Sequence, residues 1–350
     1  FISNVNFKPD TRIDILFNLL TSKKNGYDDD FSYRKFQELF EGSNDFWKKK
    51  QINNFTTAWK EIKQIYYTLK YWYEESTLYH YIGFLIYYDE NLSDILENCR
   101  NKTKPQIEEK LKEKVSHKLK IKDDYRIEEL SYSDDKPDCK KILVFFNIQT
   151  SLKQHKKLRR RGNINGDVTY YKFPFDLLKL NSWDIEHVGS QKKNSLKKNK
   201  DRIIWLGYVN ELNANHGDWQ QIKSRAFKLK QDLEESKESK TDSFEKLYED
   251  VCNIFQSSDE ITADTIDNLT LLDAGTNRGY GNALFPSKRL EIIKKDKNGA
   301  FIPPCTKNLF LKYYSQDDNS TSQWKNTWSD NDRKMYLKSL KELISELNIT

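Results

Sequence analysis

Two short stretches, WDIEHV at residues 183–188 and IDNLTLL at residues 266–272, organise the chain. The pattern around them predicts a strand, a long excursion, a second strand and then a helix. An acidic residue and a histidine, Glu186 and His187, stand next to each other on the first predicted strand. Asn277 follows Asn268 by nine positions and falls in the predicted helical region.

The side chains in these stretches suit the hydrolysis of a phosphodiester bond. That reaction needs a base that activates water and a cation that neutralises charge on the leaving oxygen. A neutral imidazole suits the first task because its ordinary pKa lies near working pH, so we expect His187 to be the base. Oxygen ligands suit a hard cation that keeps open positions, so Glu186 and Asn277 are the expected ligands of Mg²⁺ or Mn²⁺. Asn268 is expected to orient the imidazole.

Two further residues support this expected site. Asp184 is the alternative acid, because it lies on the same strand face as Glu186. Asn282 lies beyond Asn277 on the expected helix. Adjacent strand residues face opposite sides, so Glu186 and His187 share one site only if the strand ends or bulges there.

The same residues resemble the HNH, or His-Me finger, endonucleases, whose core is called a ββα-metal fold. The spacing from Asn268 to Asn277 is similar to the family's spacing from its loop asparagine to its helical metal ligand. An acid–His pair followed by IDN and NRG runs resembles the HNH module of RNA-guided CRISPR nucleases. The longer context, with FPF at 173–175 and NALFPSKR at 282–289, resembles the nuclease part of GmrSD-type modification-dependent restriction proteins.

The resemblance implies a DNA endonuclease of a restriction or anti-phage system, acting on double-stranded, foreign or modified DNA. The expected fold class is mostly α (α+β), with a helical scaffold at 1–135 and an HNH-type nuclease domain at 136–350. Its ββα core is expected at about 180–295, with an insertion at about 191–262 between the strands. GmrSD-type proteins carry an N-terminal nucleotide-binding domain. The chain opens on Phe1 and has no glycine-rich phosphate loop, so we expect that domain to be missing.

Composition and cysteine placement bound the class of protein. Lys and Arg number 59 against 53 Asp and Glu, and the net charge of +6 permits an anionic partner without requiring one. The four cysteines are scattered and form no CxxC pair, which indicates neither a zinc ribbon nor a disulfide framework and favours a reducing compartment. No run of ~20 apolar residues predicts a membrane span. We therefore expect a cytoplasmic protein with no membrane partner.

Two basic clusters, at 153–161 and 192–202, bracket the acid–His pair in the sequence. One such cluster alone is usually a solvated loop, but two beside a candidate phosphodiesterase strand favour contact with phosphate. The expected DNA-binding residues are Lys156, Lys157, Arg159, Arg160, Lys192, Lys193, Lys288 and Arg289.

The first 130 residues are predicted to be helical. A charged amphipathic helix is predicted at 102–124, with one apolar face. Aromatic residues recur at near-helical spacing from Trp59 to Tyr73. They invite an interpretation as base-stacking residues, but core positions are the more common outcome because aromatics dominate burial energy. His80 lies in this aromatic region and is expected to be structural.

In the second half of the chain the spacing of the apolar residues changes. The apolar run 141–148 is predicted to be a buried strand, and 167–175 is a further strand candidate. A short apolar segment is predicted at 203–209, and a helix at 219–247. The last helix is predicted to start near Ser329, a capping-type residue.

Two other functions fit parts of the same sequence. A non-catalytic DNA-binding module that uses the basic clusters at 153–161 and 192–202 would bind DNA in a salt-dependent way and would not cleave it. A helical interaction scaffold would show no salt-dependent DNA binding at all. A decayed catalytic site would be expected to have lost at least one expected side chain. All four expected catalytic and metal-binding residues are present, which favours catalysis.

Overall fold

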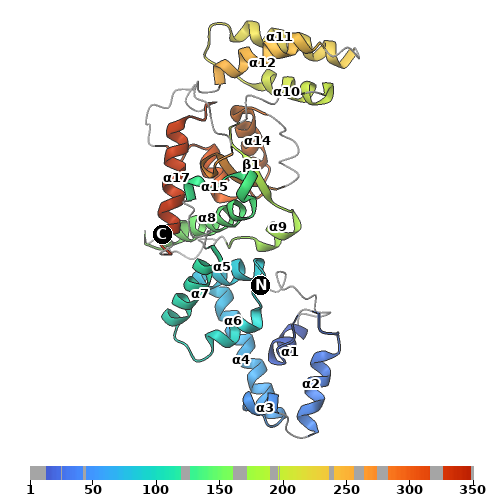
Figure 1. The fold of residues 1–350 in the computed structure, drawn as a ribbon, viewed down its shortest axis with the longest axis vertical. Coiled ribbons are helices and arrows are strands. Elements are labelled where there is room, and N and C mark those ends of the chain that lie inside the picture. Colours follow the sequence, from blue (N-terminus) through green and yellow to red (C-terminus); the bar gives the residue numbers. More distant parts are fainter. Residues whose placement is uncertain are drawn as a thin grey trace. The chain divides into compact units, whose positions relative to one another are not determined.

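The computed structural model describes residues 13–24, 26–41, 45–119, 127–160, 172–189, 196, 198–235, 240–255, 264–273, 283–315 and 326–347, apart from the side chains of 40 and 155–160. These residues form a mostly helical protein with a two-stranded sheet (Figure 1). The mostly α fold class is therefore confirmed, while the identity of the core as an HNH fold stays a prediction. In the part of the chain just given, no helix is both long and apolar enough to cross a membrane.

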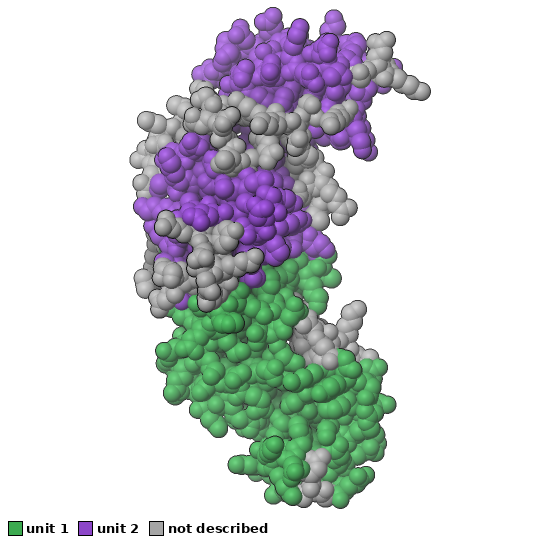
Figure 2. Space-filling view, in the orientation of Figure 1, with its two compact units in different colours: residues 1–120, 151–180 green, residues 121–150, 181–350 purple. Residues whose placement is uncertain are grey.

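The chain folds into two compact units, which Figure 2 colours separately. Unit 1 contains residues 1–120 and 151–180, and unit 2 contains residues 121–150 and 181–350. The expected boundary after residue 135 lies near the start of the long helix α8 (Tyr132–Arg160), whereas the two units divide after residue 120 and after residue 150, the second point being inside that helix. Residues 151–180 therefore belong with the N-terminal helices rather than with the expected nuclease domain.

The described helices of unit 1 are α1 (Asp14–Leu20), α2 (Phe31–Phe40), α3 (Asp45–Lys49), α4 (Phe55–Glu74), α5 (Ser76–Tyr87), α6 (Leu92–Cys99), α7 (Lys104–Leu119) and α9 (Phe175–Leu180). Those of unit 2, with its strands and short 3-10 turns, are η2 (Ile127–Glu129), β1 (Asp184–His187), α10 (Asn199–Glu211), α11 (Trp219–Glu235), α12 (Thr241–Phe255), η3 (Ile266–Asn268), β2 (Leu269–Leu272), α14 (Phe285–Lys297), α15 (Pro304–Phe310) and α17 (Asp330–Ser345).

Helix α5 is the buried centre of unit 1, since every residue from 78 to 86 is buried. The short helix α9 packs so close that a Cβ at Gly83 would lie 2.2 Å from the ring of Phe175, so glycine is required there. The buried imidazole of His80 accepts the backbone N–H of Phe173 at 3.0 Å, and its Nδ1 lies 2.7 Å from the carbonyl of Ser76. The prediction that His80 is structural is confirmed.

Helices α7 and α4 are both amphipathic but use their aromatic and apolar residues differently. In α7 the four apolar residues at four-residue steps are all buried, as predicted. In α4, Ala58, Ile62, Ile65 and Trp72 form the buried face. Trp59, Tyr66 and Tyr73 are exposed, so the prediction that these aromatics lie in the core is wrong for these three. Only one stripe of this long helix faces the rest of the unit, and the three lie outside it.

Residues 141–148, predicted as a strand, lie inside helix α8. Residues 142–150 are all buried, including the polar Asn147, Gln149 and Thr150. The apolar residues 142–146 follow one another without interruption, so they have no periodicity that distinguishes a helix from a strand. Pro137 is compatible with this helix because Asp135 has non-helical dihedral angles (φ −124°, ψ 27°). The helix effectively restarts there, which places the proline in a first turn. The other candidate strand, 167–175, lies mostly outside the described residues and ends in α9.

Strand β1 pairs with β2 in antiparallel register, with Asp184 opposite Leu272 and His187 opposite Leu269. Strand β2 is buried at all four positions. Helix α17 supports it, because the hydroxyl of Tyr336 donates to the carbonyl of Leu269 at 2.9 Å. The predicted order of two strands separated by a long excursion is confirmed, and helix α14 follows them. Helix α14 begins only at Phe285, so Asn277 and Asn282, expected on this helix, precede it and lie outside the described residues. The predicted start of α17 is confirmed by a capping box at Ser329.

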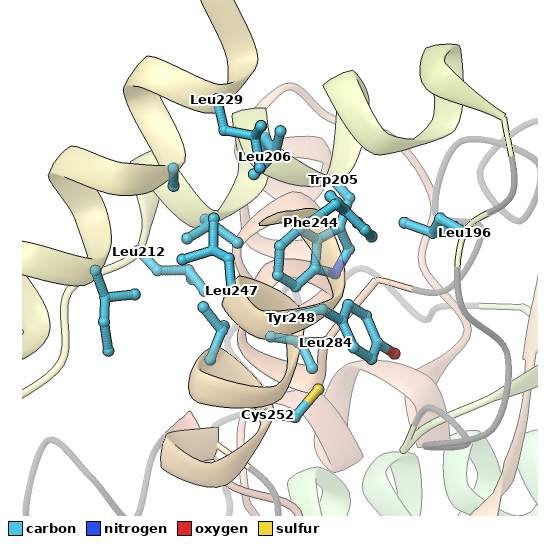
Figure 3. Close-up of a cluster of buried hydrophobic side chains, with 14 of the residues drawn as sticks. Leu196, Trp205, Leu206, Leu212, Leu229, Phe244, Leu247, Tyr248, Cys252 and Leu284 are labelled. Atoms are coloured by element: carbon cyan, nitrogen blue, oxygen red, sulfur yellow. The ribbon is translucent and has the colours of Figure 1, made fainter. Parts of the chain in front are cut away.

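The excursion between the two strands contains α10, α11 and α12, which share a cluster of buried hydrophobic side chains (Figure 3). The ring of Trp205 from α10 lies 5.4 Å from that of Phe244 and 5.0 Å from that of Tyr248, both on α12. The predicted helix at 219–247 is two helices, since α11 ends at Glu235 and α12 starts at Thr241. The insertion is therefore helical and has its own core.

Candidate functional site

Strand β1 presents its acid and its histidine on opposite faces. The pairing with β2 runs without interruption to His187, the last residue of the strand, so side chains alternate along it. Glu186 is 6% exposed. The side chain of His187 is 27% exposed and emerges at the strand end. The strand ends as the sequence required, but no bulge brings the two side chains onto one face.

The imidazole of His187 is held by Asp264. Its Nε2 lies 3.0 Å from Oδ1 of Asp264. The ring of Tyr132 contacts the imidazole edge to face, with centroids 5.0 Å apart. An ionised carboxylate can only accept a hydrogen bond, so the proton of the neutral imidazole belongs on Nε2. Nδ1 then carries the lone pair that could accept a proton from water.

Asp264 is itself fixed by the segment that begins α8. Its carbonyl accepts the backbone N–H of Tyr132 at 2.7 Å, and Ser131 forms a β-bridge with Thr265. Its other carboxylate oxygen, Oδ2, accepts the hydroxyl of Ser133 at 3.2 Å. The partner of the imidazole is therefore positioned by main-chain and side-chain bonds, which is the usual way that a functional histidine is oriented.

Asn268 acts on the main chain that follows β1. Its Oδ1 accepts the N–H of Gly189 at 2.8 Å, and its Nδ2 donates to the carbonyl of Gly189 at 3.2 Å. Its own carbonyl accepts the N–H of Val188 at 2.8 Å. Asn268 is fully buried. The sequence assigned Asn268 to the imidazole itself, whereas these bonds hold the chain one and two residues beyond His187.

Glu186 forms a buried ion pair with Lys288 on the first turn of α14. The Lys288 Nζ lies 2.6 Å from Oε1 of Glu186 and donates to the carbonyl of His187, also at 2.6 Å. Lys288 is only 2% exposed. The expectation that Lys288 contacts a DNA phosphate is contradicted for this arrangement, because its ammonium is enclosed against Glu186. A buried charge requires such a partner, since desolvation of an unpaired one is costly.

Asp184, the alternative acid, lies nearer solvent and is paired with Lys136 at 3.0 Å. Partial burial would raise the pKa of Asp184. The backbone N–H of Ile185 and the ammonium of Lys136 outweigh burial, so the net pKa lies below the ordinary value of 3.8. Lys136 also donates to the hydroxyl of Tyr132 at 3.0 Å, and this bond is the largest cause that raises the pKa of Lys136. Asp184 is thus ionised and linked through Lys136 to the ring beside His187.

In this arrangement Glu186 is bound to Lys288 and is not open to a divalent cation. Within the ranges that the structure covers, no group of three or more His, Cys, Asp or Glu could hold a metal ion. Glu186 already binds an ammonium, and a cation placed on it would face that like charge at short range. Asn277, the other expected ligand, lies outside the described residues. A cation could use Glu186 only after Lys288 moved away.

The remaining expected residues are placed only in part. Asn282, Lys192 and Lys193 lie outside the described residues. Arg289 is half-buried, donates through Nε to the carbonyl of Phe310 at 2.9 Å, and has a pKa lowered by burial. Lys156, Lys157, Arg159 and Arg160 lie on α8, and their side chains are outside the description.

Sequence reasoning missed Asp264 as the partner of the imidazole. The two residues are separated by 77 positions, and only the pairing of β1 with β2 brings them together. The available signal was an acid four positions before Asn268, close to the start of the second strand. An acid at that distance from a strand start is too common to be singled out without the fold.

Comparisons with protein-family models, with curated proteins and with solved structures find no match to this chain.

Proposed function

We propose that the chain is a DNA endonuclease of the HNH, or His-Me finger, type, in which His187 is the general base. Three features support the proposal: a two-stranded antiparallel sheet followed by a helix, an accessible imidazole at the strand end, and an asparagine that fixes the adjoining main chain. The observation that carries it is the bond from His187 to Asp264, because it leaves Nδ1 as the basic atom.

In this proposal each residue has a defined task. Nδ1 of His187 takes the proton from the attacking water, and Asp264 holds the tautomer that makes Nδ1 basic. Asn268 keeps the chain after the strand in place. Lys288 binds the carbonyl of His187 and so fixes the strand end from the opposite side.

The metal requirement is also a proposal. A bound Mg²⁺ or Mn²⁺ would supply a Lewis acid that neutralises charge on the leaving oxygen. Its expected ligands are Glu186 and Asn277. We propose that Lys288 must release Glu186, and that the carboxylate must reach the face of His187, before the ion can act on the same phosphate. The role in defence against phage or other foreign DNA, and the action on modified duplex DNA, rest on the sequence resemblance alone.

The direct test is nicking of supercoiled plasmid by the full chain with Mg²⁺ or Mn²⁺ and with EDTA. We expect His187→Ala to reduce cleavage by about 10²- to 10⁴-fold, since a positioned general base contributes that much. His117→Ala, which removes an exposed histidine on α7, is the matched control and should cut like the parent protein. A folded His187→Ala variant that cleaves at the parental rate would refute the assignment.

A second candidate function is supported by the Glu186–Lys288 ion pair, which leaves the acid committed to a protein partner. In that case the chain is a DNA-binding module that uses its basic clusters and does not cleave. It predicts salt-dependent binding of duplex DNA and no nicking under any metal condition. The same plasmid assay, run beside a binding titration, separates the two functions.

A further inference from the structure

Unit 1 contains a pocket of about 740 Å³ that is rich in positive charge. It lies between helix α4 and the segment that runs from the end of α6 into the start of α7, and these are the light-blue to teal helices of Figure 1. The cationic side chains that line it are Lys60, Lys63, Arg100, Lys102 and Lys104. Glu61 is the acidic residue among its described lining residues.

Much of this positive charge is not neutralised by the protein. Glu61 is bound by Arg100, and Lys104 pairs with Glu75 at 2.5 Å. Lys60, Lys63 and Lys102 are exposed, and none of them forms an ion pair with any residue that the structure describes. Three cations at one concave surface give it a positive potential that favours a polyanion.

Two tyrosines stand beside these cations. Tyr67 is 63% exposed and Tyr71 is 38% exposed, and both line the pocket. They are four positions apart on α4, so they lie on the same side of the helix. The ring of Tyr66 meets that of Tyr67 edge to face at 5.4 Å and supports it from outside the pocket. Aromatic faces that are open to solvent next to basic side chains are the arrangement on which unpaired bases stack.

A third aromatic residue, Trp72, also lines the pocket. It is almost fully buried, and its indole N–H has no hydrogen-bond partner among the described residues. Water or the acceptor atoms of a ligand can satisfy such a donor. The indole N–H groups of Trp219 and Trp328 have none among these residues either, so this donor alone does not indicate a ligand.

A second set of exposed aromatic residues lies on a different side of α4. Phe55, Trp59, Tyr66 and Tyr73 recur at steps of four and seven residues, which places them in one row along the helix. With 3.6 residues per turn, Tyr67 and Tyr71 lie roughly a third of a turn away from this row. The row is therefore not part of the pocket.

We propose that the α4 pocket binds single-stranded nucleic acid, with phosphates on Lys60, Lys63 and Lys102 and bases on Tyr67 and Tyr71. A duplex keeps its base faces stacked on one another, so it could use the lysines but not the tyrosines. An acidic peptide would likewise leave the rings unused. This site lies in unit 1, so its binding is independent of the proposed catalysis at His187.

The test is fluorescence anisotropy with a labelled oligo(dT) and the full chain carrying His187→Ala, in EDTA, so that cleavage cannot interfere. We expect Tyr67→Ala with Tyr71→Ala to weaken binding by about 5- to 100-fold for each base that loses its stacking partner. Tyr67→Phe with Tyr71→Phe should bind like the parent, since phenylalanine keeps the ring. Lys60→Ala with Lys63→Ala should reduce the slope of log K against log salt by about 1.4.

Lys228→Ala with Lys246→Ala is the matched control for charge. These lysines line a different pocket, between α11 and α12, which has no aromatic residue among its described lining. An equal loss in this control would mean that only net charge matters, and would overturn the proposal. So would an unchanged affinity in the tyrosine-to-alanine variant, or equal binding of duplex DNA. Displacement of the labelled oligo(dT) by an equal concentration of a mononucleotide or of poly-glutamate would also overturn it.

Discussion

The side chains on the two faces of strand β1 differ in how far they are exposed to solvent. On one face, Glu186 is sealed against Lys288, and neither side chain is more than 8% exposed. At the strand end on the other face, His187 is partly open to solvent and its imidazole is held by Asp264. The comparison teaches that two residues adjacent in a motif need not form one site. The sealed face serves structure in this arrangement, and the open face presents the group that can accept a proton.

The largest expected effect comes from opening the sealed face with Lys288→Met. This change leaves the Glu186 carboxylate buried without its counter-ion, which typically costs about 3–5 kcal/mol of unfolding free energy. Urea unfolding of the two proteins measures the loss. The double variant Glu186→Gln with Lys288→Met should recover part of it, because the uncompensated charge is gone. Little loss in Lys288→Met would mean that the ion pair is not formed in solution.

The same variant tests the proposed link between Lys288 and the metal. If Glu186 can hold a divalent cation once the ammonium is gone, Mg²⁺ should raise the melting temperature of Lys288→Met more than that of the parent. The effect should be absent in the double variant, which lacks the carboxylate. Equal shifts in all three proteins would exclude Glu186 as a ligand, whatever the outcome of the plasmid assay.

On the open face, Asp264→Asn should reduce the rate of cleavage by about 10- to 100-fold, the usual cost of losing a residue that orients a functional histidine. Substrate affinity should change little, because Asp264 acts through His187. The decisive measurement is the combination with His187→Ala: if Asp264 works only through the imidazole, it adds nothing in that background. Additive losses would give Asp264 a separate role.

The smallest expected effect concerns Asp184 and Lys136, which are each more than a third exposed. Solvent screening limits their pairing to at most about 1 kcal/mol, so Lys136→Met should cost no more than that at neutral pH. The pKa of Asp184 is lowered in the folded chain, so its contribution is present above 3.8 and is lost as pH falls through the folded pKa. A double-mutant cycle with Asp184→Asn, followed by urea unfolding, should show a coupling that vanishes in that acid range. A coupling unchanged there would contradict the assignment.

The elements with clear periodicity could be read from the sequence, and those buried on every side could not. Helix α7 shows one apolar residue per turn against charged neighbours, which leaves only one interpretation. Residues 142–150 lack such contrast, and only their helical hydrogen bonding in the folded chain distinguishes α8 from a strand. The prediction for helix α4 was wrong for a different reason. Its aromatic residues occupy more of the helix surface than the rest of unit 1 covers.

The candidate site, too, could be predicted from the sequence only in part. The motif correctly indicated two strands, the acid–His pair and an asparagine at the start of the second strand. It did not indicate Asp264, nor the enclosure of Lys288 against Glu186, because both depend on pairs of residues 77 and 102 positions apart. Residues so far apart in the sequence show no local pattern that links them. They come into contact only when the two strands pair and α14 packs against them.

The sequence by itself determined which chemistry-bearing residues the chain contains, where its periodic helices lie and that a long insertion separates two short strands. These properties are local, because propensity and periodicity act over a few turns. Only the tertiary structure decided which side chains are paired, which are sealed and which are open to solvent. Pairing and burial depend on distance in space. An ionic group that is buried without a partner loses its hydration and strongly destabilises the folded chain.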